Sequence, residues 1–194
     1  ALPETTAEVA QLVRLCGEFD VPIVPRGAGT GLSGGAAGIE GALTIAFTKM
    51  HRVLEIDHEN LVVVTQPGVV NADLKKAVAA EGLFYAPDPA SYETCTIGGN
   101  LGTNAGGVAV LAFGNTRQLV LGIEAVLADG RIVPGLKALK KDNTGYDIRD
   151  LLIGSEGTLG IITAVVLKLF PKPAEKATAF IALPKLESAL ELFT

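Results

Sequence analysis

A glycine-rich segment near the start of the chain limits its possible folds more than any other stretch. It begins Pro25-Arg26-Gly27-Ala28-Gly29-Thr30-Gly31-Leu32-Ser33-Gly34-Gly35, and seven of the fifteen residues from Gly27 to Gly41 are glycine. Glycine adopts positive φ without steric cost and lets another molecule approach the backbone. Successive N–H groups in such a turn can form a concave nest for an anion. We therefore expect a loop that presents its backbone to a phosphate-bearing ligand.

A second glycine cluster, Gly98-Gly99-Asn100-Leu101-Gly102-Thr103-Asn104-Ala105-Gly106-Gly107, follows some seventy residues later. It lies in a stretch that starts near residue 84 and contains Pro87 and Pro89, and we expect this stretch to be a long irregular segment. Long loops within compact domains are usually functional. Two such loops predict one large ligand that is held from two sides.

Three phosphate-binding patterns compete for the first loop. A P-loop is excluded, because no Gly-Lys-Ser/Thr follows. The dinucleotide fingerprint matches at Gly29, Gly31 and Gly34, but it must open a helix. Residues 35–41 disfavour one, since each interior glycine costs about 1 kcal/mol relative to alanine. The favoured pattern is a non-helical nest of amides with the Thr30 and Ser33 hydroxyls, and a solvated surface loop remains the alternative.

Composition limits the kinds of partner. The chain has 194 residues, 48% of them hydrophobic and 19% charged, with a net charge of −5. Binding to phosphate backbones depends on Lys and Arg, so nucleic acid and acidic membranes are not expected as partners. The one basic cluster, Lys137, Lys140 and Lys141, is interpreted as a solvated loop. We see no signal peptide, and the apolar runs are too short for a transmembrane segment.

The cysteines and histidines give no sign of a catalytic or metal site. Cys16 and Cys95 are isolated, so neither a zinc site nor a redox dithiol is predicted. Packing is the favoured role for both, although Cys95 could lie near a ligand. His51 and His58 flank a predicted strand without other catalytic groups nearby, and we expect them at the surface. No catalytic residue and no metal ligand are predicted in this chain.

Hydrophobic periodicity predicts alternating helices and strands. A helix over 5–19 has Thr5 and Glu8 at capping-box spacing. Its expected inner stripe consists of Val9, Leu12, Val13, Cys16 and Phe19. A second helix over 71–81 has Asn71 as its expected N-cap. The expected strands are 21–26, 42–47, a hairpin of 53–57 with 61–66, a hairpin of 119–128 with 131–133, and 159–170. Residues 178–194 resemble the opening strand and helix of another unit.

Several blocks together carry a family resemblance. Besides the first loop they are Gln66-Pro67-Gly68-Val69, Pro87-Asp88-Pro89, Cys95-Thr96-Ile97-Gly98-Gly99-Asn100, Thr103-Asn104-Ala105-Gly106-Gly107, Thr144-Gly145-Tyr146-Asp147 and Gly154-Ser155-Glu156-Gly157-Thr158-Leu159-Gly160-Ile161-Ile162-Thr163. In this order they resemble the FAD-binding (PCMH-type) domain of the vanillyl-alcohol-oxidase superfamily. The similarity lies in the branch of FAD-linked D-lactate dehydrogenases, glycolate oxidase D-subunits and D-2-hydroxyglutarate dehydrogenases. It covers residues 1 to about 183.

The resemblance implies an α+β fold, a two-lobed FAD-binding domain. Strand–helix alternation independently favours a small α/β lobe with some parallel pairing near the start. We place this small α/β lobe at residues 1–66 and a larger lobe, a mixed or antiparallel sheet with helices, at 67–175. Residues 176–194 would begin a truncated C-terminal substrate domain. The chain lacks an initiator Met and stops inside a predicted helix, so we interpret it as a piece of a longer protein.

The resemblance also assigns the residues that bind the cofactor, FAD. The first loop would wrap the pyrophosphate, the 67–68 block would line the cofactor, and residues 87–89 would shape a wall of the flavin site. Residues 96–104 would add amides and polar contacts, and the 154–163 block would hold adenosine. The full expected set is Pro25, Arg26, Gly27, Ala28, Gly29, Thr30, Gly31, Ser33, Gly34, Pro67, Gly68, Pro87, Asp88, Pro89, Thr96, Ile97, Gly98, Gly99, Asn100, Thr103, Asn104, Glu156, Gly157, Gly160, Ile161 and Ile162.

Relatives that tether FAD covalently from the first loop carry His or Cys near it. Ala28, Ser33 and Ala36 occupy that region here, so non-covalent binding is expected. Cofactors supply the difficult chemistry, and the protein supplies binding and orientation.

The implied reaction is oxidation of a D-2-hydroxy acid by hydride transfer to flavin N5. Its partners would be the hydroxy acid, bound by the missing domain, and an electron acceptor: a quinone, an electron-transfer protein or an iron–sulfur subunit. This chain alone should be inactive. The expected location is cytoplasmic, with peripheral membrane association of the full-length protein left open. The alternative is a non-catalytic nucleotide-binding module or a Rossmann-like NAD binder.

Overall fold

The centre of the fold is a five-stranded antiparallel sheet. The computed structural model describes residues 1–193, and its main sheet has the order β3-β4-β8-β6-β7. The strands are β3 (Val53–Asp57), β4 (Val62–Thr65), β6 (Val120–Val126), β7 (Ile132–Gly135) and β8 (Ile161–Lys168). All pairings within it are antiparallel. The α+β class and both predicted hairpins are therefore confirmed.

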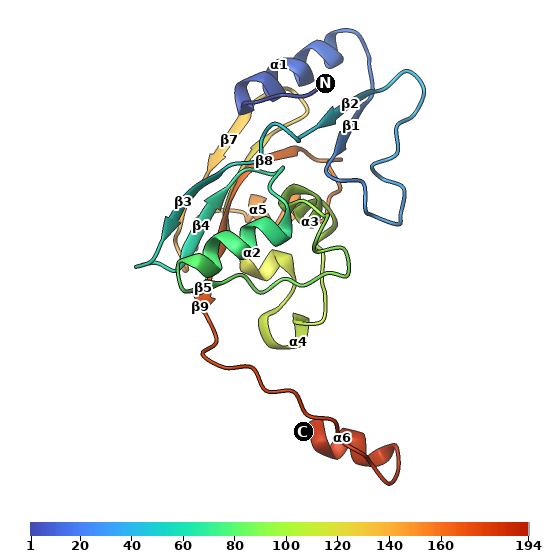
Figure 1. The fold of residues 1–194 in the computed structure, drawn as a ribbon. Helices are drawn as coiled ribbons and strands as arrows, with labels where there is room; N and C mark the ends of the chain where they lie inside the picture. The colour runs from blue at the N-terminus through green and yellow to red at the C-terminus, as the bar shows by residue number, and fades with distance from the viewer. Residues whose placement is uncertain (194) are drawn as a thin grey trace.

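The middle strand, β8, joins two hydrophobic cores. Only its last residue, Lys168, is not buried, as expected for a central strand that is covered on both faces. The larger core packs sheet residues such as Val165 and Leu167 against α2 (Asn71–Ala80), α3 (Ile97–Thr103) and α5 (Ile148–Leu152). The smaller core contains Ile161 and lies beneath α1 (Thr6–Glu18). Figure 1 shows α2 and α3 beside the sheet and α1 at one end of it.

Helix α1 forms as the capping signal predicts. The N–H of Glu8 donates to the Thr5 side chain at 3.2 Å, while the Glu8 carboxylate accepts from the Glu4 N–H at 2.8 Å. Val9, Ala10, Val13 and Cys16 are buried, which confirms the packing role of Cys16. The expected inner position of Phe19 is wrong. The helix ends at Glu18, so Phe19 leaves the apolar stripe and is 65% exposed.

A small parallel pair carries the first glycine loop. Strands β1 (Ile23–Arg26) and β2 (Leu43–Ala46) pair in parallel, which confirms parallel pairing in this part of the chain. Residues 27–42 connect them without a helix. The boundary that was predicted at residue 66 falls between β4 and α2, yet β3 and β4 pair into the main sheet. The sheet therefore extends across that boundary.

The second glycine cluster differs from the expected irregular loop. Residues 97–103 form helix α3, whose N-cap Thr96 accepts the Gly99 N–H at 3.2 Å. Glycine disfavours helix in isolation, but here tertiary packing decides. A β-carbon at Gly98 would lie 2.6 Å from the β-carbon of Pro67, so only glycine allows this close approach. Cys95, just before the cap, is buried as predicted.

The remaining elements are short. They are β5 (Leu83–Phe84), which pairs with β9 (Phe170–Pro171), α4 (Val110–Phe113), the 3₁₀ helix η1 (Thr116–Leu119) and α6 (Glu187–Phe193). The predicted strand 159–170 is interrupted at Leu169. At the second helix the N-cap is Val70, not the predicted Asn71, which is the first helical residue and is fully buried. Residues 172–186 contain no strand, so that part of the final unit is wrong, and Thr194 lies outside the described residues. Figure 1 shows residues 172–193 leading away from the sheet.

Candidate functional site

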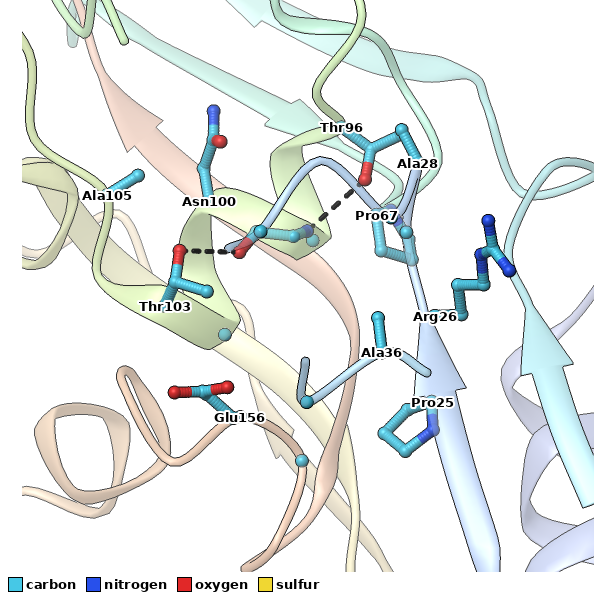
Figure 2. A pocket seen from close by; sticks show the side chains of 18 of the residues that line it. Pro25, Arg26, Ala28, Ala36, Pro67, Thr96, Asn100, Thr103, Ala105 and Glu156 are labelled. Carbon is cyan, nitrogen blue, oxygen red and sulfur yellow. Dashed lines mark hydrogen bonds between the residues drawn. The ribbon is translucent and has the colours of Figure 1, made fainter. Parts of the chain in front are cut away.

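One cleft gathers most of the glycine-rich sequence (Figure 2). Its walls are the first glycine loop, helix α3 and the turn before β8. The residues that line it are Pro25, Arg26, Gly27, Ala28, Gly29, Thr30, Gly31, Ser33, Gly35, Ala36, Phe47, Pro67, Pro89, Ser91, Thr96, Gly98, Gly99, Asn100, Gly102, Thr103, Ala105, Leu152, Glu156, Gly157, Gly160, Ile161 and Ile162. Segments that are far apart in the sequence thus form one concave surface.

The glycine loop presents free donors to this cleft. Among residues 1–193, no backbone N–H from Ala28 to Gly35 donates a hydrogen bond to a protein acceptor. The Thr30 and Ser33 hydroxyls also have no protein partner there. Such groups need water or a ligand as acceptor. Gly29 and Gly34 have φ of 76° and 82°, a region that side chains disfavour. The loop therefore combines unused amides with a conformation that requires glycine.

Close contacts fix the loop against the other two walls. A β-carbon at Gly27 would collide with the Thr96 hydroxyl, and one at Gly35 would collide with the Glu156 carboxylate. The backbone of Gly157 packs equally tightly on the Pro25 ring. A larger residue at Gly157 would push the walls apart, because the Pro25 ring cannot rotate away, whereas the exposed Glu156 side chain could move to make room at Gly35.

Helix α3 provides polar side chains on the opposite wall. Thr96, Asn100 and Thr103 all line the cleft. The Thr103 hydroxyl donates to the Gly99 carbonyl at 3.1 Å, and Figure 2 shows this bond beside the Thr96 cap. Asn100 is only 4% exposed, and its side-chain nitrogen has no protein partner within residues 1–193. A buried donor of this kind calls for an acceptor, from water or from a ligand.

The backbone amides at the start of α3 are less available than expected. The N–H groups of Ile97 and Gly98 donate to the carbonyls of Val69 and Pro67, at 2.8 and 2.7 Å. The Gly99 N–H is taken by the Thr96 cap. Expected donors at Ile97 and Gly98 therefore hold the helix to the 67–69 turn. The wall that α3 offers consists of side chains and glycine surface.

The third wall is the turn before β8. The N–H groups of Gly154 and Glu156 donate to Leu101 and Gly102 carbonyls of α3, both at 2.9 Å. The Arg117 guanidinium donates to the Ile153 carbonyl at 2.5 Å. The first two bonds fasten the turn to α3, the third fastens it to η1, and together they hold Glu156 at the cleft.

The cleft carries little charge for its size. Arg26 and Glu156 are its only charged lining residues among those that the structure describes. Within the described range neither has an ion-pair partner. An anion bound here would interact chiefly with peptide dipoles rather than with lysine, in agreement with a nest.

Most of the predicted site residues line this cleft, but six do not: Gly34, Gly68, Pro87, Asp88, Ile97 and Asn104. Ile97 and Pro87 are buried. Asp88 pairs with Lys75 at 2.8 Å, and the Asn104 side chain accepts the Arg117 N–H at 2.9 Å. Gly68 is packed against Phe47 and Met50. These five residues support the walls, whereas Gly34 is exposed in the first loop with nothing within 4 Å of a β-carbon there.

Sequence reasoning missed seven lining residues: Gly35, Ala36, Phe47, Ser91, Gly102, Ala105 and Leu152. Gly35, Gly102 and Ala105 lie inside the glycine-rich clusters and could have been included on that basis. Phe47 and Leu152 are ordinary core residues, 6% and 2% exposed, with no local signal. The expected surface placement of His51 and His58 is confirmed.

Within residues 1–193, no group of three or more His, Cys, Asp or Glu side chains is arranged to hold a metal ion. None of the described helices combines the length and apolar character needed to cross a bilayer.

Comparison with known proteins adds named relatives. Glycolate oxidase subunit GlcD of Bacillus subtilis (strain 168) is 47% identical over 189 residues, which cover 97% of this chain and 40% of the relative. D-lactate dehydrogenase of Anaerostipes hadrus is 44% identical, covering 96% and 39%. The mitochondrial D-2-hydroxyglutarate dehydrogenase of Bos taurus is 42% identical, covering 98% and 35%. The chain thus spans about two fifths of the length of these relatives.

A solved structure and a family model agree with this. The structure of alkyldihydroxyacetonephosphate synthase superposes with a TM-score of 0.81 at 28% identity, covering 90% of this chain and 32% of that one. The family model described as an FAD binding domain matches residues 1–134. The expected family, fold class and cofactor are thereby confirmed. The chain belongs to the FAD-binding-domain family of FAD-linked oxidoreductases, within the vanillyl-alcohol-oxidase superfamily.

Proposed function

We propose that this cleft binds FAD non-covalently, with the pyrophosphate on the amides of Ala28 to Gly35. The observation that carries the proposal is the run of N–H groups in that loop without protein acceptors. We further propose that the longer protein oxidises a D-2-hydroxy acid and passes electrons to a separate acceptor. The names of the relatives, glycolate oxidase, D-lactate dehydrogenase and D-2-hydroxyglutarate dehydrogenase, support that substrate class.

The residues of the cleft fit this cofactor. A diphosphate needs several donors and close backbone approach, and the glycine loop offers both. The unpartnered Asn100 nitrogen on the facing wall would donate to a carbonyl or ring nitrogen of the flavin. Phe47, Ile161 and Ile162 supply apolar surface to the same cleft, which suits the planar rings of a dinucleotide.

The chemistry of the lining supports non-covalent binding. No His or Cys lines the cleft within residues 1–193. Cys95, the nearest cysteine in sequence to α3, is 3% exposed and is not among the lining residues. We therefore expect FAD to leave the protein on denaturation.

The reaction itself needs groups beyond those in this cleft. When bound, FAD would supply the hydride acceptor for the substrate carbon. A substrate carboxylate needs a cation and the hydroxyl proton needs a base. The described cleft offers only Arg26 and Glu156, and neither belongs to a cluster of titratable groups. We place the base, the carboxylate-binding cations and the contact with a quinone, an electron-transfer protein or an iron–sulfur subunit in the remainder of the longer protein. A cytoplasmic location remains a prediction.

No observation favours the alternative, a Rossmann-like NAD binder. The glycine fingerprint is followed by residues 35–42 without a helix, so the required helix N-terminus is missing.

Direct titration would test the proposal. The purified chain should retain one FAD through gel filtration and release it unmodified in acid or denaturant, while NAD should not be retained. Retention of NAD instead of FAD would contradict it. The longer protein should reduce an artificial dye with D-lactate, glycolate or D-2-hydroxyglutarate. L-lactate and L-2-hydroxyglutarate are the matched controls for the two chiral substrates.

A further inference from the structure

Two fully buried polar side chains behind the cleft have no hydrogen-bond partner in the protein. Asn71, the first residue of α2, and Tyr85, directly after β5, are both 0% exposed. Within residues 1–193, no protein group bonds to the Asn71 side-chain nitrogen or oxygen, or to the Tyr85 hydroxyl. Neither residue lines the cleft. Groups buried this deeply are nearly always hydrogen-bonded, because the unfolded chain bonds them to water and folding would otherwise lose that bond.

Both side chains belong to segments that meet at Cys95. The Asn71 backbone N–H donates to the Cys95 carbonyl at 2.9 Å. Burial raises the pKa of the Tyr85 phenol, with a further contribution from the nearby Cys95 thiol. Cys95 is itself only 3% exposed and is a free thiol. An amide, a phenol and a thiol from three separate segments therefore lie around one point, between the start of α2 and the residue before the α3 cap.

The chemistry of these groups limits what could satisfy them. The Asn71 amide needs both an acceptor and a donor, and the Tyr85 hydroxyl can use either. An ion is a poor fit, because the amide and the phenol are neutral and a buried charge needs an opposite one. An organic ligand cannot reach side chains that have no exposed surface. Water both donates and accepts, and a buried water typically makes about three hydrogen bonds to such groups.

We propose that Asn71 and Tyr85 bind one ordered water molecule beside Cys95, as a permanent part of the fold. The Asn71 amide and the Tyr85 hydroxyl are its two strong partners, and the thiol is a third, weaker one. The site lies where the backbones of Val70 and Thr96 pair in an isolated bridge, just before α2 and α3 begin. The water therefore joins the starts of both helices from the inside and supports the α3 wall. This site is independent of the ligand that the cleft binds.

The sign of one substitution distinguishes a hydrated hydroxyl from an orphaned one. Tyr85→Phe removes only the hydroxyl, and urea unfolding of the 194-residue chain measures the result. If water bonds the hydroxyl, the folding equilibrium constant should fall roughly fivefold, as for one lost hydrogen bond. An unchanged or higher constant would overturn the proposal, because removing a buried orphan is neutral or stabilising. Tyr92→Phe is the matched control. Its partly exposed hydroxyl donates to Glu93 at 3.2 Å, and the constant should change by about twofold or less.

A shared water also couples the two residues. In an Asn71→Leu background, which lacks the amide, Tyr85→Phe should lower the constant by about twofold or less instead of fivefold. A crystal structure of the wild type should show ordered water within hydrogen-bond distance of both side chains. Equal costs of Tyr85→Phe in the two backgrounds would overturn the shared site. So would a crystal structure in which the site is dry or the two side chains bond directly to protein groups. If Asn71→Leu does not fold, the sign of Tyr85→Phe and the crystal structure decide.

Discussion

Gly27 lies directly against the side chain of Thr96, so closely that a β-carbon at Gly27 would collide with the Thr96 hydroxyl. The same hydroxyl accepts the Gly99 N–H and caps α3. The first glycine loop and the second glycine cluster therefore meet at this point. The contact of Gly27 with Thr96, together with the nearby backbone of Gly99, thus joins two walls of the cleft.

A substitution at Gly31 distinguishes an effect on ligand binding from an effect on folding. Nothing lies within 4 Å of a β-carbon at this position, and its φ is not in the left-handed region. Gly31→Val should therefore change the free energy of unfolding of the apo chain by only about 0.5 kcal/mol. FAD affinity should fall at least about tenfold, because the side chain would occupy the ligand's space. Thermal unfolding and FAD fluorescence titration measure the two effects. Unchanged affinity would contradict the loop assignment.

Gly29 should show both effects at once. Its φ is 76°, and a β-carbon would lie 2.7 Å from the Arg26 guanidinium. Gly29→Val should abolish FAD retention and also destabilise the apo chain by about 1–3 kcal/mol, because a β-branched residue resists positive φ. Gel filtration with FAD and urea unfolding are the measurements. Wild-type retention would refute the assignment of this loop.

Gly99 and His51 test the ranking of sites. Gly99 lines the cleft, and a β-carbon there would lie 3.3 Å from the Thr96 hydroxyl, while His51 is exposed and outside it. Gly99→Val should weaken FAD binding about tenfold or more by adding volume to the wall of the cleft. His51→Ala should leave the dissociation constant unchanged. If calorimetric titration showed that His51→Ala weakens FAD binding more than Gly99→Val does, the assignment of α3 as a wall of the FAD site would be wrong.

Gly68 is expected to affect the stability of the fold more than ligand binding. A β-carbon at Gly68 would overlap the carbonyl of Phe47 and lie 2.7 Å from that of Met50, and both are backbone atoms that cannot rotate away. Gly68→Ala should cost about 3 kcal/mol or more in unfolding free energy, measured in urea. Gly17→Ala, in α1 with open space around it, is the control and should be neutral or stabilising by up to about 1 kcal/mol. Equal midpoints for the two variants would contradict the packing.

Asp57 should contribute to the loss of folding stability at acidic pH. Its pKa is lowered from 3.8, first by the hydrogen bond from the Asn60 side chain and then by the Asn60 N–H. Because the folded pKa lies below the unfolded value, the contribution is fully present above that value and is lost as pH falls through the folded pKa. Asp57→Asn should therefore lower the urea midpoint at pH 6, and the difference should shrink as pH falls below 3.8 towards the lowered folded pKa. A difference in urea midpoint that stays constant at all pH values would show that the ionised Asp57 carboxylate is not the source of the stability.

Local sequence signals predicted those elements whose own residues determine them. The Thr5 cap and apolar spacing were enough to predict α1, and the strand-like runs 119–128 and 131–133 were enough to predict the β6–β7 hairpin. The prediction that Phe19 is buried was wrong because the apolar periodicity continues past the point where the helix ends. The prediction for the glycines of α3 was wrong in the opposite way, because a helix forms where an irregular loop was expected. Their weak intrinsic helix propensity is outweighed by packing on Pro67, which no local window contains.

Residue type and order alone were enough to predict the glycine loop, the absence of a lysine within it and the family to which its blocks belong. The packing in three dimensions determined which amides remain free, because Ile97 and Gly98 donate theirs to Val69 and Pro67, respectively, while the first loop does not. It also decided that Glu156, 120 positions after Ala36, faces the same cleft. Hydrogen-bond partners and shared surfaces are properties of distance in space, which separation along the chain does not give.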